Sequence, residues 1–425
     1  MITPSPFLTC QEWENLPESC NLTESEADRL YDLARHSARR LKLPEDAVLT
    51  RTRHGLKAGQ VVGILVIPRK TLEILPKIDG ENSNVREALV RMLAVAYNLR
   101  VVDGKLATLA VQQHDLLEML VRLFADQLLA AVRRGLPRRY ISHEEDLKLL
   151  RGKLNVTRQI TYLAFRPDLL ACRFDELFED TPLNRVLKAA VSRLAGITRS
   201  VANARLLAQL AAYLEFVGNS PDPLCERVRL DRTNTAFHDL YSLACLFLQG
   251  DWQSTTSGGS PGFSLLFPMN DLFEKFIGQS LKRTLHQPVY LQDRRHHVLT
   301  NTDGSSIFNL KPDAVINDVP DGPIILDTKW KSLTPDNKRT LGVEESDIYQ
   351  MLAYGQAYEA SSLILLYPWH SEMDSKGISR DWTFTGTSRH LYIETINVGY
   401  PDKVPEILRC IMNRVINHLN KAGEP

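Results

Sequence analysis

The sequence has few cysteines, and none of them form a metal-binding pattern. Its six cysteines are scattered, without a Cys-x-x-Cys pair or a Cys/His group at zinc spacing, which argues against a disulfide framework and a zinc module. Net charge is also lacking, because 51 basic and 51 acidic residues balance over 425 positions. No chain-wide field therefore draws the protein to nucleic acid or an anionic membrane, and any such binding needs a local patch.

Signals for membranes and for nucleotide binding are missing as well. No apolar run approaches the roughly 18 residues of a membrane span, and the first twenty residues lack a basic region followed by an apolar one. We therefore expect a cytoplasmic protein with no membrane partner. The phosphate-binding pattern G-x-x-x-x-G-K-S/T is absent, so a partner would have to bind the nucleotide in any NTP-driven process.

The order of local patterns predicts an α+β multidomain protein. Residues 1–80 combine a helix, with Thr23 and Glu26 as a capping box, and short β-rich runs that suggest a small β meander. Residues 81–253 are mainly helical by their apolar periodicity. Residues 254–264, rich in Ser, Thr, Gly and Pro, form a boundary or mobile loop. Residues 265–425 alternate helices and strands, which predicts an α/β domain with a mixed sheet.

Chemically active side chains gather at the strands predicted within residues 310–331. Asp327 and Lys329, two residues apart, project the same way from a strand end, while Thr328 points to the other face. The turn-forming NDVPDG stretch would fold a hairpin and bring Asp313 beside Asp327. Two adjacent carboxylates repel unless a cation lies between them, and hard oxygen ligands suit Mg²⁺. A metal with a lysine beside it supplies the chemistry of phosphodiester hydrolysis.

A plain structural role fits the same residues. Pro312 and Asp313 would then form a strand-edge turn, and Asp327 with Lys329 a surface pair worth under about 1 kcal/mol. The apolar IILD run before the pair is typical of a buried strand, which favours the functional interpretation. The next helix also places Gln350 and Tyr354 four apart on one face, within reach of the carboxylates or of a DNA phosphate.

With these residues the sequence resembles the PD-(D/E)xK nucleases and, within them, the McrC subunits of modification-dependent (5-methylcytosine) restriction systems. The nuclease resemblance rests on Asp313, Asp327, Lys329 and the IYQMLAY helix. The McrC resemblance covers roughly residues 82–420 through further segments: MLAVAYNL, VRRGLPRRY, RGKLNV, FDELFEDTPLNRVLKAA, DLFEKF and LLLYPWH. It implies a restriction-endonuclease-like fold for residues 265–425.

The resemblance also implies roles for individual residues. Asp313 and Asp327 correspond to the metal-binding carboxylates, Lys329 to the catalytic lysine, and Gln350 and Tyr354 to accessory positions on the following helix. A further position, Glu274 in DLFEKF, matches the place where many of these nucleases offer a third carboxylate to the metal. A solvated helix residue explains Glu274 equally well.

The function implied is a Mg²⁺-dependent DNA endonuclease that is stimulated by a McrB-like AAA+ GTPase ring, which recognises the modified DNA. Residues 81–253 would contact this partner, and the resemblance carries nothing over to residues 1–80. Two alternatives stay open: an autonomous exonuclease or repair nuclease with the same catalytic residues, and a non-catalytic DNA-binding scaffold. Candidate contacts to phosphate or to the partner are four arginines: Arg138, Arg139, Arg294 and Arg295.

Overall fold

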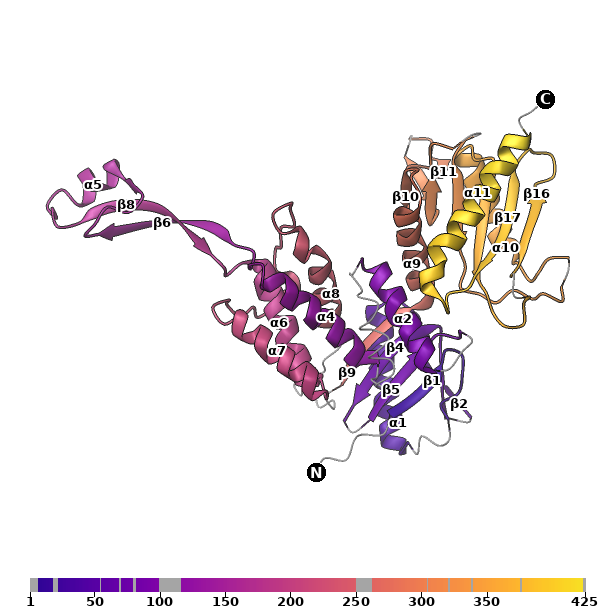
Figure 1. Cartoon of the computed structure of the whole chain (residues 1–425), viewed down its shortest axis with the longest axis horizontal. Coiled ribbons are helices and arrows are strands. Elements are labelled where there is room, and N and C mark those ends of the chain that lie inside the picture. Colours follow the sequence, from indigo (N-terminus) through magenta and orange to yellow (C-terminus); the bar gives the residue numbers. More distant parts are fainter. Residues whose placement is uncertain are drawn as a thin grey trace. The chain divides into compact units, whose positions relative to one another are not determined.

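The computed structural model describes residues 7–422, except 18–21, 54, 69, 79–81, 99–115, 250–261, 304, 320–321, 338 and 375–376. The chain divides into two compact units, one of residues 1–119 with 250–425 and one of residues 120–249 (Figure 1). Helices alternate with several sheets, which confirms the predicted mixed α and β composition. The division into residues 1–80, 81–253 and 265–425 stays a prediction, and most of the proposed loop at 254–264 lies outside the described residues.

The first unit contains a four-stranded sheet near the N-terminus. Its strand order is β1 (Phe7–Gln11), β5 (Lys70–Leu75), β4 (Val61–Ile67) and β9 (Phe263–Pro268). Strand β1 runs parallel to β5, whereas β4 is antiparallel to both of its neighbours. The predicted meander is therefore wrong: β2 (Leu49–Thr52) and β3 (Gly55–Ala58) form a separate hairpin.

Strand β9 completes this sheet from far along the sequence (Figure 1). Strands β4 and β9 approach so closely that a Cβ on Gly63 would lie 2.0 Å from the carbonyl oxygen of Leu265. Gly63 also has φ +130°, a backbone conformation that side chains disfavour. Glycine at this position is therefore what allows β4 and β9 to pair.

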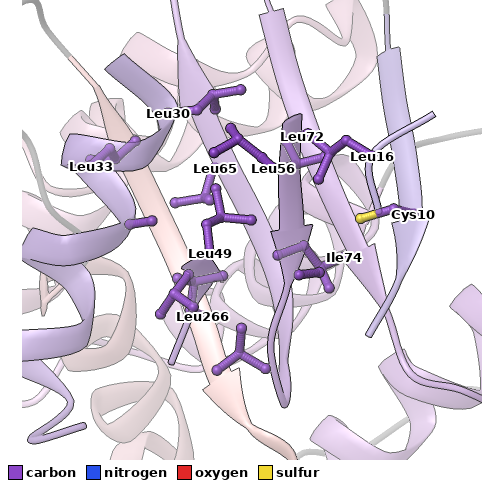
Figure 2. Close-up of a cluster of buried hydrophobic side chains, with 14 of the residues drawn as sticks. Cys10, Leu16, Leu30, Leu33, Leu49, Leu56, Leu65, Leu72, Ile74 and Leu266 are labelled. Atoms are coloured by element: carbon purple, nitrogen blue, oxygen red, sulfur yellow. The ribbon is translucent and has the colours of Figure 1, made fainter. Parts of the chain in front are cut away.

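Helix α1 (Glu24–Arg40) covers one face of the sheet and begins at the predicted capping box. The Glu26 amide donates to Thr23 Oγ1, and the Thr23 amide donates to Glu26 Oε2, which satisfies two amides that the helix leaves free. Figure 2 shows Leu30 and Leu33 of α1 packing with Leu65 and other buried aliphatic side chains of the strands. Burial of this apolar surface holds the module together.

A six-stranded sheet follows in the same unit. Its order is β10 (Val289–Leu291), β13 (Ala314–Ile316), β14 (Ile324–Thr328), β15 (Ser362–Pro368), β17 (His390–Ile396) and β16 (Ser379–Thr383). Strands β14, β15 and β17 are parallel, and the other pairs are antiparallel. The predicted mixed sheet is confirmed. The helices of this part are α9 (Met269–Thr284), α10 (Glu345–Ala357) and α11 (Val404–Ala422). Helix α2 (Asn82–Ala96) comes from earlier in the chain.

The run IFNLKPDAVI contains two strands. Strand β12 (Ser306–Asn309) pairs with β11 (His297–Thr300) in a hairpin of its own, and β13 begins at Ala314. Between them lies Pro312, which has no amide hydrogen to give to a sheet. The break leaves Asp313 at the very start of β13.

The second unit, residues 120–249, contains a helical core and a β ribbon. Its helices are α6 (Pro182–Ile197), α7 (Val201–Tyr213) and α8 (His238–Gln249), joined by the rest of α4 (Leu116–Val132). Rings of Phe124 and Phe247 meet edge to face at 5.5 Å. Thr181 caps α6 and Pro182 occupies its first turn, as the FEDTPLNR segment predicts.

The ribbon consists of β6 (Arg139–Leu147), β8 (Leu170–Phe178) and the short β7 (Lys153–Leu154). Figure 1 shows it extending from the helices of its unit, with α5 (Val156–Tyr162) at the far end. Helix α5 begins after Asn155, whose side chain accepts the amide of Arg158. Over the described part of the chain, no helix is long and apolar enough to cross a bilayer.

We expect Leu65→Ala to lower the free energy of unfolding of the N-terminal sheet by about 2–5 kcal/mol, because it leaves a cavity in a packed core. Leu65 is fully buried, whereas Leu299 on β11 is 52% exposed. Leu299→Ala is therefore the matched control, with an expected change within about 0.5 kcal/mol. Denaturant unfolding of both variants tests this, and equal losses would contradict the assigned core.

Candidate active site

The pairing of β13 with β14 brings two carboxylates together. The strands are antiparallel, with Ala314 opposite Leu326, so the next pair outward is Asp313 and Asp327. The hairpin predicted from the NDVPDG turn therefore forms, and it places the two acids at adjacent strand ends. Side chains alternate along β14, so Asp327 shares a face with Ile325, which packs in the core beneath α10.

Lys329 connects Asp327 to α10. Its Nζ lies 2.6 Å from Asp327 Oδ2 and 3.6 Å from a carboxylate oxygen of Asp347, and it donates to Gln350 Oε1 at 2.8 Å. The Lys329 amide donates to the carbonyl of Leu366 at 2.9 Å, which continues the β14–β15 ladder. The predicted projection of Asp327 and Lys329 to the same side is confirmed.

Gln350 and Tyr354 extend this network, as the four-residue spacing predicts. Gln350 Nε2 donates to the Tyr354 hydroxyl at 2.8 Å, and that hydroxyl donates to the carbonyl of Lys311 at 3.1 Å. Lys311 lies two residues before Asp313. The two helix residues thus hold the lysine and also contact the segment that carries the first acid.

The environment of Asp313 opposes its ionised form. Burial, together with the charges of Asp327 and Glu274, raises the pKa of Asp313 to about 7, although two hydrogen bonds from Thr328 act the other way. Both the amide and the hydroxyl of Thr328 donate to Asp313 Oδ2 at 2.7 Å. Thr328, expected to point away from the acids, therefore contacts one of them.

Asp327 and Lys329 stabilise each other's charges in a buried place. Asp327 is 2% exposed, and burial raises its pKa in spite of the attraction of Lys329. Burial by itself lowers the pKa of Lys329, but the nearby charges of Asp327 and Asp347 outweigh it and the pKa rises. The lysine is thus a firmly protonated cation facing two acids.

Glu274 approaches the acids from α9 without completing a three-ligand cage. Its charge contributes to the raised pKa of Asp313 and of Asp327, and its Oε1 accepts a hydrogen bond from Gln292. Across the ranges that the structure describes, no three His, Cys, Asp or Glu side chains are already arranged to hold a metal ion. Two buried carboxylates that repel each other still fit Mg²⁺, which keeps several waters and takes one or two protein carboxylates.

Asp347 is a site residue that the sequence reasoning missed. It is 5% exposed on α10 and lies 3.4 Å from Nζ of Lys331, besides its contact with Lys329. Its position three residues before Gln350 on the same helix face was the available signal. Asp347 gives Lys329 a second negative partner.

Other sequence candidates have structural partners. Trp330, the residue after Lys329, is 6% exposed, so its indole packs inside the protein. Arg295 pairs with Asp293, and Arg138 donates to Glu179 at 2.8 Å. These two arginines are therefore engaged within the chain.

Comparisons with known proteins agree with the family that the sequence resembles. The family profile described as "McrBC 5-methylcytosine restriction system component" matches residues 56–368, which is well over half of the chain. The chain belongs to this family. The resemblance to the McrBC restriction system is thereby confirmed, and no curated protein matches the chain.

Solved structures of the McrBC family share the fold. One is a chain in the refined half-complex from the tetradecameric assembly of Thermococcus gammatolerans McrB AAA+ hexamers with bound McrC, with 23% identity, TM-score 0.70, and coverage of 96% of this chain and 100% of that one. Another is a chain in the cryo-EM structure of the Thermococcus gammatolerans McrBC complex, with 27% identity, TM-score 0.55, and coverage of 67% and 89%.

We expect Asp313→Asn to stabilise this McrBC-family protein, and to do so more at pH 8 than at pH 5. The pKa of Asp313 rises from 3.8 to about 7 on folding, so stability falls as pH rises through this window and stays lower above it. Asparagine can still accept both bonds from Thr328 and carries no charge. The expected gain at pH 8 is about 2–4 °C in melting temperature, or roughly 1 kcal/mol.

Thermal unfolding at both pH values measures this effect. Asp336→Asn is the control, because Asp336 is an exposed carboxylate outside the network. A melting temperature for Asp313→Asn that is unchanged or lower at pH 8 would contradict the assigned repulsion.

Proposed function

We propose that the chain is the Mg²⁺-dependent DNA endonuclease subunit of a McrBC-type modification-dependent restriction complex, with a PD-(D/E)xK nuclease domain in residues 265–425. The observation that carries the proposal is the arrangement of Asp313 and Asp327 at adjacent strand ends, with Lys329 paired to Asp327 at 2.6 Å. Two acids and a lysine in this order are the elements of that nuclease motif. Membership of the McrBC family supports the restriction context.

Each side chain has a role in this proposal. Asp313 and Asp327 would hold Mg²⁺, with Glu274 as a third acid, and release of the Asp313 proton near neutral pH frees its oxygens for a cation. When bound, Mg²⁺ would polarise the phosphodiester and lower the pKa of a water. Lys329, kept cationic, orients the attacking water or stabilises the charge that develops on the phosphate.

Gln350 and Tyr354 fix the direction of Lys329. Gln350 Oε1 accepts the ammonium at 2.8 Å, and Tyr354 holds the amide of Gln350 from the other side. A lysine side chain carries its ammonium on a flexible four-carbon stem, so such contacts restrict it to one geometry. Their role is to keep the cation at the carboxylates when no DNA is present.

We expect Asp327→Ala to lower DNA cleavage by at least about 10²–10³-fold, the loss seen when one charge-stabilising group is removed from an active site. The measurement is Mg²⁺-dependent cutting of methylated and unmethylated plasmid by the chain alone and with a McrB-like AAA+ protein and GTP. Asp336→Asn is the control and should cut at the parental rate.

Each outcome distinguishes one function. Cutting of methylated DNA only in the complete mixture, lost in Asp327→Ala, supports the endonuclease subunit. Parental activity in Asp327→Ala rejects the assigned site. Cutting by the chain alone favours an autonomous exonuclease or repair nuclease, and no cutting in any mixture favours a DNA-binding scaffold.

We further infer that a McrB-like AAA+ GTPase ring is the partner that recognises modified DNA. The sequence lacks a nucleotide-binding loop of its own, and a related structure is described as McrB AAA+ hexamers with bound McrC. The surface that fits a protein partner is the apolar arm, which we define as residues 139–178. Its exposed side chains include Tyr140, Leu149, Ile160, Tyr162 and Phe165.

Exposure of this kind indicates binding. Phe165 is 97% exposed and Tyr162, three positions before it, is 79% exposed, and large exposed apolar groups are typical of interaction surfaces where they gather. Aromatic side chains also contribute more than their share to binding energy at protein interfaces. The apolar arm therefore supports contact of the second unit with the ring.

We expect Phe165→Ser to weaken binding of the AAA+ partner by about tenfold or more, because an aromatic contact is typically worth over 1 kcal/mol. Phe216→Ser is the matched control, since Phe216 is 84% exposed in the same unit but outside the arm. Sedimentation of the complex with GTP measures the affinity. Equal effects of the two substitutions would reject the arm as the contact surface.

A further inference from the structure

Trp330, which directly follows Lys329, is held by residues from the N-terminal module. Its indole Nε1 donates to Glu12 Oε1 at 2.8 Å, and its carbonyl accepts from Gln60 Nε2 at 2.8 Å. Glu12 follows β1 and Gln60 precedes β4. The residue next to the proposed catalytic lysine is therefore fixed from the four-stranded sheet.

Glu12 is itself immobilised. Its amide donates to the carbonyl of Leu75 at 2.9 Å, which extends the pairing of β1 with β5, and its Oε1 accepts the amide of Lys77 at 2.9 Å. Glu12 is 1% exposed, and burial raises its pKa to about 7. A carboxyl buried this deeply costs stability, which is typical of residues that serve a site.

The ring of Trp330 is fixed as well. Phe273 of α9 meets it edge to face with 5.2 Å between ring centroids, and Phe273 is directly followed by Glu274. Trp330 is thus held at its indole nitrogen, its ring and its carbonyl. Such a residue cannot shift without breaking its contacts to both Glu12 and Phe273 of α9.

The position of Lys329 depends on this anchor. On one side the Lys329 amide bonds to Leu366, and on the other side the chain continues directly into Trp330. Lys329 lies just beyond the last residue of β14, so the residue that follows it also helps to fix its backbone. Displacement of Trp330 would therefore move the ammonium away from Asp327.

We propose that Glu12 is a positioning residue for DNA cleavage, which acts through Trp330 to set the place of Lys329. The N-terminal module then contributes to the position of Lys329 through Glu12. This proposal rests on the nuclease function proposed above, and it concerns residues for which the family resemblance implied no role.

The test is cleavage of methylated DNA by the complete complex under single-turnover conditions. Glu12→Ala leaves the indole without an acceptor, and we expect the cleavage rate constant to fall about 10- to 100-fold, as for a small displacement of a reacting group. DNA affinity and partner affinity stay at parental values, because neither Glu12 nor Trp330 is exposed. Trp330→Phe, which removes the same hydrogen bond from the other side, has the same effect.

Rescue and control variants separate positioning from loss of stability. Glu12→Gln keeps an oxygen that accepts both bonds, so its rate constant stays close to the parental value. Leu8→Ala removes a buried side chain of the same module, 4% exposed on β1, and lowers the melting temperature without lowering the rate constant. A parental rate in Glu12→Ala, or an equal loss in Leu8→Ala, overturns the proposal.

The indole N–H resonance of Trp330, assigned by its absence in Trp330→Phe, reports the contact independently of cutting. It shifts in Glu12→Ala and returns toward the parental position in Glu12→Gln, and an unshifted resonance overturns the proposal. If the parental complex does not cut DNA, the proposed function fails and the positioning role fails with it. If the parental complex cuts and Glu12→Ala cuts equally well, only the positioning role fails.

Discussion

Repulsion between Asp313 and Asp327 is the constraint on which the arrangement of the site depends. The β13–β14 pairing brings the two acids together in a buried place. The charge of Lys329 and two hydrogen bonds from Thr328 offset part of the repulsion, and the pKa of Asp313 stays raised. The compensation is incomplete, because Glu274 and Asp347 add further negative charge. A site built this way costs stability, as functional sites often do.

Lys329 has to satisfy two demands at once. It neutralises Asp327, and the proposed nuclease role requires it to stay available to a substrate. Its contacts are shared among Asp327, Asp347 and Gln350. If Asp327 or Asp347 were removed, the other would remain as a partner of Lys329. In the proposed nuclease, a cation bound between Asp313 and Asp327 would therefore compete for Asp327, while Asp347 and Gln350 keep the ammonium in place.

Much of this site could be predicted from the sequence, because its signals are local. A turn between two apolar runs predicts the hairpin, alternation predicts that Asp327 and Lys329 share a side, and helix spacing joins Gln350 to Tyr354. What the sequence could not indicate depends on long-range contacts: β9 in the N-terminal sheet, and Glu12 beneath Trp330. The parallel placement of β1 belongs to the same class, since nothing near Phe7–Gln11 marks its partner.

The path of the chain explains why these distant contacts matter. After the second unit the chain returns as β9, pairs with β4, and continues at once into α9, which carries Phe273 and Glu274. Closing the N-terminal sheet and placing α9 beside the acids are therefore one structural event. Residues 120–249 form a compact unit inserted before this point. The bonds that hold Lys329, Trp330 and Glu12 lie outside it, so these contacts of the site form within the first unit.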